Sequence, residues 1–285
     1  MKLGVSMYCY VRPVNAGQMD LASFIREAKR IGADGVELLD FFYRDRDKDR
    51  ETAQNLLAET GLVCGVFSVA QNFALRDAEA RTKEVDKIKF GIEEALFYGA
   101  KTVRVFAGDV SPNGEISLEE AHGWIVDGLS EASVLAEQAG VRLALENHGR
   151  LAGRSHQVRK IIDDVRAKSG NNALGANPDT GNFMLVGQAS DEAIADVADL
   201  AYMVHLKDFM HVPEGFEGYA YDALTGEKFI GTVIGEGEVN LAGCLGTLKD
   251  RGFSDWVNLE YEGDQGDIPA NVEASLNNAK RLLGR

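Results

Sequence analysis

The sequence predicts an α/β protein that folds as a single (β/α)8 TIM barrel, and three observations lead to this prediction. The chain has 285 residues, close to the roughly 250 residues typical of one such barrel. Short apolar runs alternate with longer amphipathic runs along the whole chain, as expected when helices join the strands of a parallel sheet. No glycine-rich phosphate loop follows the first apolar run, which argues against an open doubly wound sheet.

Eight strand segments are expected, and a helical segment follows each of them except the seventh, which is followed by a long loop. The helix beginning after Ser117 shows the clearest start signal, because Glu120 completes a capping box with that serine. Gly61 is typical of a helix end. The predicted strands cover residues 2–10, 35–40, 62–70, 101–108, 141–149, 173–183, 201–209 and 256–263. The predicted helices cover 19–33, 49–61, 78–98, 117–140, 155–168, about 190–199 and 268–284.

Residues 1–285 are expected to form one domain, since no linker or low-complexity tract interrupts the pattern. The one irregular unit is a long loop at about 209–238 between the seventh and eighth strands. Loops of this length without regular structure are often functional, although this one can also pack its own aromatic side chains on the surface. Its aromatic residues are Phe209, Phe216, Tyr219, Tyr221 and Phe229.

The composition excludes several classes of partner. The net charge is −15, whereas phosphate backbones and anionic membranes select clustered Lys and Arg, so neither nucleic acid nor membrane binding is expected. The three cysteines, Cys9, Cys64 and Cys244, form no CxxC pair and suit a reducing compartment. The first residues lack the apolar core of a signal peptide, and no stretch of about 18 apolar residues occurs. A cytoplasmic protein is therefore expected.

Four neighbouring strands end in side chains that can bind a metal. Glu146, Asp179, His205 and Glu260 lie one per strand at the ends of the fifth to eighth predicted strands. In a TIM barrel the C-terminal ends of the strands form the active site, so these four side chains can converge at the barrel mouth. Each of them alone is an ordinary rim or structural residue. Their joint occurrence in consecutive strands is what predicts a site.

A divalent cation is the expected occupant of this site. Three carboxylates placed together repel one another and stay partly protonated unless a cation compensates their charge. Oxygen-rich ligation with a single imidazole suits Mn²⁺, Mg²⁺ or Co²⁺ better than a thiolate-binding metal. We expect one ion per chain, with Mn²⁺ as the first choice and Mg²⁺ or Co²⁺ as alternatives.

The motifs that carry these residues also resemble a known family. The segments LALENHG, NPDTGNF and VHLKDF, together with GEGEVN and VNLEYEG, are similar to those of the xylose-isomerase-like TIM-barrel superfamily. In layout the chain looks closest to ketose 3-epimerases, inosose dehydratases and hydroxypyruvate isomerases. The resemblance implies that Glu146, Asp179, His205 and Glu260 hold one divalent metal. It also implies that Glu146 and Glu260 exchange protons with the substrate.

That double role predicts a metal-dependent isomerase or epimerase acting on a ketose or related polyol. Removal of a proton next to a carbonyl gives an enediolate, which a metal stabilises as a Lewis acid. Carboxylates on opposite sides of the sugar can then act as base and acid. Return of the proton to the other face is epimerisation, transfer to the neighbouring carbon is isomerisation, and loss of β-hydroxide is dehydration. The fold does not select among these reactions.

Two residues near the predicted ligands bear on the choice of reaction. The resembled epimerases typically have a His three residues after the metal-binding Asp, but this chain has Asn182 there. Asn can bind a substrate hydroxyl but cannot accept a proton, so simple 3-epimerisation is less secure. Strand alternation sends His148 to the same side as Glu146 if the strand extends that far. His148 is expected to be catalytic as a general base, with a hydrogen-bonded wall residue as the alternative.

Further residues are expected to line the pocket. Lys207 is a candidate for contacting substrate hydroxyls or, with Asp208, for orienting His205; a rim salt bridge is the alternative. Glu37 on the second strand and Arg104 on the fourth are candidate substrate-binding residues, although inward-facing charges in barrels are often structural pairs.

Three other functions stay open at this stage. The resembled superfamily includes catalytic subunits that split C-glycosides carrying a 3-oxo sugar, often with a small partner subunit, and an aryl group would suit the loop aromatics. An inosose-type dehydratase is the second alternative, and a non-enzymatic barrel subunit is the third. Zinc-dependent endonucleases share the barrel plan but need more histidines than the five present and a basic groove. The expected partners are a small sugar or glycoside and further copies of the chain.

Overall fold

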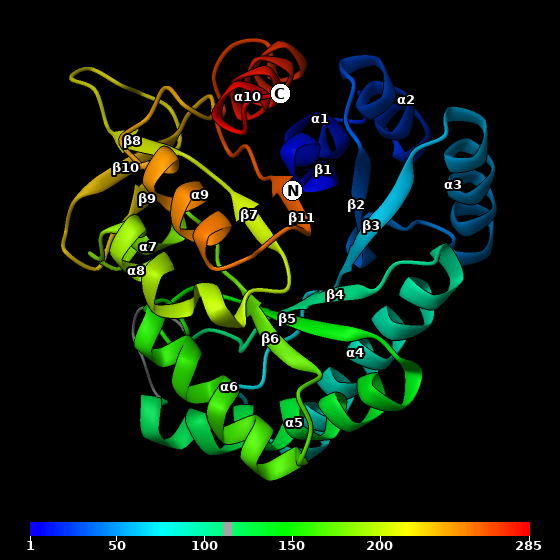
Figure 1. Cartoon of the computed structure of the whole chain (residues 1–285), viewed down its shortest axis with the longest axis vertical. Helices are drawn as coiled ribbons and strands as arrows, with labels where there is room; N and C mark the ends of the chain where they lie inside the picture. The colour runs from blue at the N-terminus through cyan, green and yellow to red at the C-terminus, as the bar shows by residue number, and fades with distance from the viewer. Residues whose placement is uncertain (111–115) are drawn as a thin grey trace.

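The structure, a computed structural model, describes residues 1–110 and 116–285. Eight parallel strands lie side by side in the order β6-β5-β4-β3-β2-β1-β11-β7, and parallel bridges Ala176–Ala201 and Asp179–His205 join the two edges. The predicted (β/α)8 barrel is therefore confirmed (Figure 1). The barrel strands are β1 (Lys2–Ser6), β2 (Gly35–Leu39), β3 (Val63–Ser68), β4 (Thr102–Val105), β5 (Arg142–Glu146), β6 (Leu174–Asn177), β7 (Val204–Leu206) and β11 (Trp256–Leu259).

Helices surround the strands, as Figure 1 shows. The capping box predicted at Ser117 is present, with the Glu120 N–H donating to Ser117 Oγ and the Ser117 N–H donating to the Glu120 carboxylate. Gly61 ends its helix with φ 68°, a left-handed conformation that glycine adopts without strain. The outer helices are α2 (Leu21–Ile31), α3 (Arg46–Thr60), α4 (Ala78–Tyr98), α5 (Leu118–Ala139), α6 (Ser155–Ser169), α8 (Ser190–Val197), α9 (Leu241–Asp250) and α10 (Ile268–Leu282).

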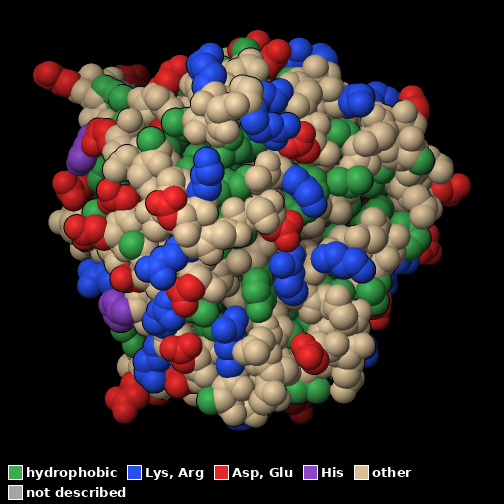
Figure 2. Space-filling view, viewed as in Figure 1, with side chains coloured by type: hydrophobic (Ala, Val, Ile, Leu, Met, Phe, Trp, Pro, Cys, Tyr) green, Lys and Arg blue, Asp and Glu red, His purple; other side chains and the backbone are tan. Residues whose placement is uncertain are grey.

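Short helical turns lie mainly near the strand ends: η1 (Met7–Tyr10), α1 (Val11–Asn15), η2 (Asp40–Phe42), α7 (Asn182–Leu185) and η3 (Ala198–Leu200). Within residues 1–110 and 116–285, no helix combines the length and apolar character needed to cross a membrane. Figure 2 shows acidic and basic side chains interspersed over the face in view. On that face the charges alternate in sign and do not form the continuous basic surface that phosphate backbones select.

The segment at 209–238 was expected to lack regular structure, and this expectation is wrong. It forms a small antiparallel sheet in the order β8-β10-β9, from β8 (Phe209–His211), β9 (Tyr221–Asp222) and β10 (Lys228–Gly231). Phe209 and Phe229 are buried in a cluster of their own with Ala223. Tyr221 packs against this cluster, with its ring centre 5.2 Å from that of Phe209. These three aromatic residues therefore hold the small sheet together, as the packing alternative supposed, whereas Tyr219 is exposed.

Asp208 fixes the small sheet to the barrel. Its buried carboxylate accepts the backbone N–H groups of Gly235, Gly237 and Val239 at 2.9, 3.0 and 3.1 Å. A Cβ added at Gly237 would lie 2.2 Å from Asp208 Oδ1, so only glycine lets the chain approach this closely. Asp208 thus has a structural role, joining the end of the inserted segment to the end of β7.

The N-terminal end of the barrel is filled by the indole ring of Trp256. Added Cβ atoms would lie 2.6 Å from this ring at Gly35 and 2.3 Å at Gly65. Gly35 is the first residue of β2, and Gly65 lies within β3. Both strands pack directly against the ring, and Trp256 itself is only 7% exposed. The Trp256 ring fits at the N-terminal end of the barrel because Gly35 and Gly65 have no side chains there.

Gly65→Ala tests this packing. Because the new methyl group would overlap a buried aromatic ring, we expect a loss of about 1–3 kcal/mol in the free energy of unfolding, measured by urea denaturation. Gly246→Ala is the matched control, since Gly246 lies in α9 with nothing within 4 Å of an added Cβ, and it should be neutral or stabilising. Equal stability of Gly65→Ala and the unmodified protein would contradict the packing account.

Candidate metal centre

The four predicted ligands meet at the C-terminal mouth of the barrel. Glu146 is the last residue of β5, Asp179 follows β6, His205 lies within β7, and Glu260 comes directly after β11. Each offers one ligand atom, and these atoms all lie within 4.8 Å of one another. All four side chains are buried. The structure thus brings together the four-residue cluster that the strand ends predicted.

His205 is held so that one ring nitrogen faces this cluster. Its Nδ1 lies 3.1 Å from Glu146 Oε2 and 3.4 Å from Glu260 Oε1. Its Nε2 lies 2.9 Å from an oxygen of Glu37, on the other side of the ring. A metal-binding histidine usually donates its second N–H to a carboxylate in this way, which fixes the tautomer and the ring orientation.

The contacts of Glu37 indicate a positioning role, while its expected role as a substrate-binding residue stays a prediction. Its side chain is fully buried, and its oxygens accept hydrogen bonds from Ser68 Oγ at 2.5 Å and Asn258 Nδ2 at 2.8 Å besides the contact with His205. A carboxylate with these protein partners is placed to position the imidazole. Its contacts favour that role over contact with a sugar.

Two buried atoms in the cluster are left without a hydrogen bond. Asp179 Oδ1 accepts the backbone N–H groups of Gly181 and Asn182 at 2.9 and 2.8 Å. In contrast, Asp179 Oδ2 and His205 Nδ1 have no hydrogen-bond partner among the described residues. Buried polar atoms are rarely left unpaired without a reason such as a bound ion. Charged groups do approach them, since Lys207 Nζ lies 3.1 Å from Asp179 Oδ2 and Glu146 Oε2 lies 3.1 Å from His205 Nδ1. Both atoms belong to the four-residue cluster, and a cation between them would complete their contacts.

The protonation of the cluster supports the same conclusion. Burial raises the pKa of the Asp179 carboxyl to about 7, and the attraction of Lys207 only partly offsets this rise. Burial also opposes the charged form of His205, but the carboxylates around it raise its pKa well above its ordinary value. Protein groups alone therefore leave an excess of negative charge that protons must compensate. A divalent cation can replace those protons.

Lys207 lies at the edge of the cluster. Its buried Nζ is 3.1 Å from Asp179 Oδ2, 2.7 Å from Glu260 Oε2 and 2.9 Å from Glu262 Oε1. It also donates to Asn182 Oδ1 at 3.1 Å. The ammonium is therefore a compact, fixed positive charge. Lys207 belongs to a buried network of ion pairs and does not form the exposed rim salt bridge that was the alternative.

Asn182, expected to bind substrate, is part of the same network. Its Nδ2 lies 3.2 Å from Glu146 Oε1 and 3.0 Å from the carbonyl oxygen of Asn147. The amide therefore holds one oxygen of Glu146 while its own oxygen accepts from Lys207. These protein contacts engage both ends of the amide. The role of Asn182 as a substrate-binding residue stays a prediction.

His148 does not join the cluster. Strand β5 ends at Glu146, so the alternation that would have carried His148 to the same side stops before it. His148 is exposed, and its ring centre lies 4.8 Å from that of Phe106. The Arg104 guanidinium covers Phe106 at 4.0 Å and places Nε 3.3 Å from Glu146 Oε2. Arg104 thus reaches the cluster directly, whereas His148 is linked to it only through this stack.

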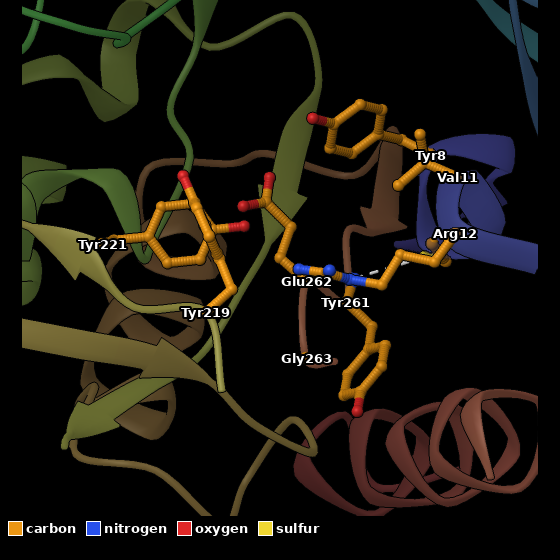
Figure 3. A pocket seen from close by; sticks show the side chains of 9 residues that line it. Tyr8, Val11, Arg12, Tyr219, Tyr221, Tyr261, Glu262 and Gly263 are labelled. Carbon is orange, nitrogen blue, oxygen red and sulfur yellow. Dashed lines mark hydrogen bonds between the residues drawn. The ribbon is translucent and has the colours of Figure 1, made fainter. Parts of the chain in front are cut away.

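A cavity lies beside the cluster, and sequence reasoning missed most of it. Its volume is about 260 Å³, and we refer to it as the tyrosine cavity. Figure 3 shows Tyr219 and Tyr221 on one side of Glu262, with Tyr8 and Arg12 on the other. Tyr8 and Arg12 follow β1, and Glu262 comes three residues after the end of β11. The rule that strand ends build barrel active sites could have indicated both positions.

Fold and site together define a class of protein: a closed (β/α)8 barrel whose mouth holds one imidazole and three carboxylates in an arrangement that can bind a divalent cation. Within that class, the model of the family described as xylose isomerase-like TIM barrel matches residues 25–282. The chain belongs to this family.

Individual relatives are distant. The inosose isomerase of Bacillus licheniformis is 27% identical over 188 residues, which cover 66% of this chain and 63% of that protein's length. Among solved structures, the D-psicose 3-epimerase of Clostridium cellulolyticum H10 with D-tagatose has a TM-score of 0.77 at 15% identity, covering 99% of each chain. The structure of the IOLI protein with a binding zinc atom has a TM-score of 0.76 at 19% identity, covering 100% of this chain and 98% of that one.

Asp179→Asn tests whether the cluster binds a cation. Addition of Mn²⁺ to chelator-treated protein should raise the unfolding free energy by about 2.7 kcal/mol when the free ion is at 100 times its Kd, seen as a rise in Tm. The substitution removes the charge of a carboxylate with an orphaned oxygen, so the rise should be largely lost. Asp163→Asn, at an exposed position on α6, should keep it. Absence of any rise in the unmodified protein would count against the metal centre.

Glu37→Gln tests the positioning of His205. Because the amide no longer fixes the imidazole as the carboxylate does, Mn²⁺ affinity measured by calorimetric titration should fall about 10–100-fold. Far-UV circular dichroism should be unchanged. The exposed Glu59→Gln on α3 serves as control. Undiminished affinity in Glu37→Gln would show that the contact with His205 does not matter for binding.

Proposed function

We propose that the protein is a divalent-metal-dependent isomerase or epimerase that acts on a ketose or related polyol by proton abstraction next to a carbonyl. The observation that carries this proposal is the placement of Glu146 and Glu260. They project from β5 and β11, the strands that flank β6 and β7, and both reach His205 Nδ1. A sugar bound in this mouth would have a carboxylate on each side.

The four-residue cluster would hold the cation, and Glu37 would orient its imidazole ligand. When bound, a divalent ion supplies Lewis-acid stabilisation of negative charge that develops on the substrate oxygens. Mn²⁺ is our first choice because three of the four donors are carboxylates, with Mg²⁺ or Co²⁺ as alternatives. The relative with a binding zinc atom makes zinc a further ion to test.

Proton transfer is assigned to the two glutamates. One carboxylate removes the proton next to the carbonyl, and the other returns a proton to the opposite face or to the neighbouring carbon. Burial and the charge of Glu260 favour the protonated form of Glu146, but His205 and Arg104 outweigh them and keep its pKa below the ordinary value. Glu146 is thus held as a carboxylate, the form a base requires.

The remaining predicted residues receive supporting roles. Lys207 would place a fixed positive charge near substrate oxygens, Arg104 holds Glu146, and Asn182 orients the same carboxylate. His148, exposed on the Phe106 ring, remains a candidate base that would act only at the rim. We retain as predictions a cytoplasmic location and self-association into a homo-oligomer.

A second candidate is a lyase that splits a 3-oxo-sugar C-glycoside, in which case a small partner subunit is also predicted. The tyrosine cavity favours this candidate, because its aromatic walls lie next to the cluster and suit an apolar or aromatic substituent. An inosose-type dehydratase would use the same two carboxylates with loss of hydroxide. The products formed from a panel of ketoses, inososes and 3-oxo-glycosides with added Mn²⁺ would separate the three reactions.

Glu146→Gln and Glu260→Gln test the proton-transfer assignment. Each amide can neither accept nor donate the proton, so turnover should fall by about 10²–10⁴-fold. Unmodified enzyme in D₂O should incorporate deuterium at the reacting carbon, detected by mass spectrometry, and the variants should not. Metal content is measured on the same samples to separate lost ligation from lost proton transfer.

The exposed Glu59→Gln again serves as control and should retain both turnover and exchange. Unchanged turnover in either glutamine variant would overturn the assignment. Turnover without deuterium uptake in the unmodified enzyme would contradict the enediolate route.

A further inference from the structure

We propose that the tyrosine cavity is a second binding subsite that holds a hydroxylated ring attached to the sugar, so that the substrate is a glycoside. This inference rests on the proposed function, because it extends the same site. The ring is either a phenol or a second sugar, and both share flat apolar faces edged with hydroxyl groups. The cavity's position, walls and size each support the proposal.

The cavity is next to the cluster but separate from it. None of the described residues that line it belongs to the four-residue cluster. Glu262 connects the two, since its side chain lines the cavity while its Oε1 lies 2.9 Å from Lys207 Nζ. Lys207 in turn contacts Glu260 at 2.7 Å. A sugar held at the cluster therefore has the cavity beyond Lys207, where a substituent on that sugar would lie.

The walls present aromatic rings from three separate parts of the chain, one of which is Tyr261 after β11. Tyr8 comes from η1, and Tyr219 and Tyr221 come from the inserted segment. The rings of Tyr219 and Tyr221 meet edge to face at 4.9 Å, and the Arg12 guanidinium lies 5.6 Å from the Tyr219 ring. Figure 3 shows Arg12 and the tyrosine pair approaching Glu262 from opposite sides. Rings of this kind stack on the faces of sugars and phenols.

Polar groups at the cavity suit the hydroxyls of such a ring. Glu262 is a partly buried carboxylate with Lys207 on one oxygen, and it lines the cavity together with Tyr221. Carboxylates accept hydrogen bonds from hydroxyls, and Arg12 can donate to their oxygens. Tyr261, by contrast, is a wall residue, since Asn271 on α10 donates to its hydroxyl at 2.8 Å.

The size of the cavity fits one ring. A cavity of roughly 150 Å³ holds a benzene molecule, so the volume of about 260 Å³ found here leaves room for a ring with hydroxyl groups. A free ketose bound at the cluster would leave this space to water. Tyr219 is 56% exposed, and burial of its ring against a substituent would remove an apolar surface from solvent.

Calorimetric titration of the Mn²⁺-loaded full chain with three unreactive glycosides tests the proposal. Methyl β-D-glucoside lacks the second ring, 4-hydroxyphenyl β-D-glucoside carries a phenol, and cellobiose carries a second sugar. At least one of the two-ring ligands should bind about tenfold more tightly than the methyl glycoside. The ligand that binds more tightly of the two shows whether the ring is a phenol or a second sugar. Equal affinities for all three ligands would overturn the proposal.

Two variants locate the effect. Tyr219→Ala removes an exposed ring and should abolish the tenfold preference, whereas Tyr221→Phe keeps the ring and should retain most of it. Leu224→Ala is the matched control, because Leu224 lies in the same inserted segment, is 49% exposed and does not line the cavity. A preference that persists in Tyr219→Ala would place the ring elsewhere and contradict the assignment.

These binding measurements need no turnover, so the subsite and the proposed proton-transfer mechanism can be rejected separately. Loss of deuterium exchange with intact ring preference would reject the proton-transfer mechanism and keep the subsite. Equal binding of the three ligands by a protein that exchanges deuterium with free ketoses would reject the subsite and keep the mechanism.

Discussion

The gathering of carboxylates in the buried mouth of the barrel is the constraint on which the rest of the site depends. Glu146, Asp179 and Glu260 are removed from water, and like charges at such distances strongly resist joint ionisation. Lys207 and Arg104 compensate part of this charge from the edge of the cluster. Burial raises the pKa of Asp179, the neighbouring glutamates add to the rise, and Lys207 offsets only part of it. A divalent cation would resolve the imbalance and would contact Asp179 Oδ2 and His205 Nδ1, which form no hydrogen bond within the part of the chain that the structure describes, although Lys207 Nζ and Glu146 Oε2 lie 3.1 Å from them.

The surrounding architecture serves to hold these groups in place. Glu37, Ser68 and Asn258 come from three other strands and form hydrogen bonds that fix the far side of His205. Asp208, directly after Lys207, anchors the inserted small sheet through three backbone N–H groups. One short stretch of chain therefore has three roles. His205 belongs to the cluster, Lys207 supplies a buried ammonium group, and Asp208 attaches the inserted segment that bears the cavity tyrosines.

Much of the fold and the core of the site followed from the sequence, for identifiable reasons. Strand and helix periodicity predicted the barrel, and the rule on strand ends placed Glu146, Asp179, His205 and Glu260 together. Two expectations about structure, the continuation of the fifth strand to His148 and the irregularity of the 209–238 segment, were wrong because they depended on where regular structure stops. Strand β5 ends at Glu146, which separates His148 from the cluster, and the glycine-rich segment after β7 pairs with itself as short strands. Glu37 was identified as inward-facing, but only the structure shows its contact with His205, 168 residues away in sequence.

Anomalous X-ray diffraction from crystals grown with Mn²⁺ tests the central claim most directly. The account predicts one anomalous peak per chain, about 2.0–2.6 Å from oxygens of Glu146, Asp179 and Glu260 and from Nδ1 of His205, with Glu37 still bonded to Nε2. A cluster that shows no such peak at saturating Mn²⁺, with protons alone balancing its carboxylates, would contradict it.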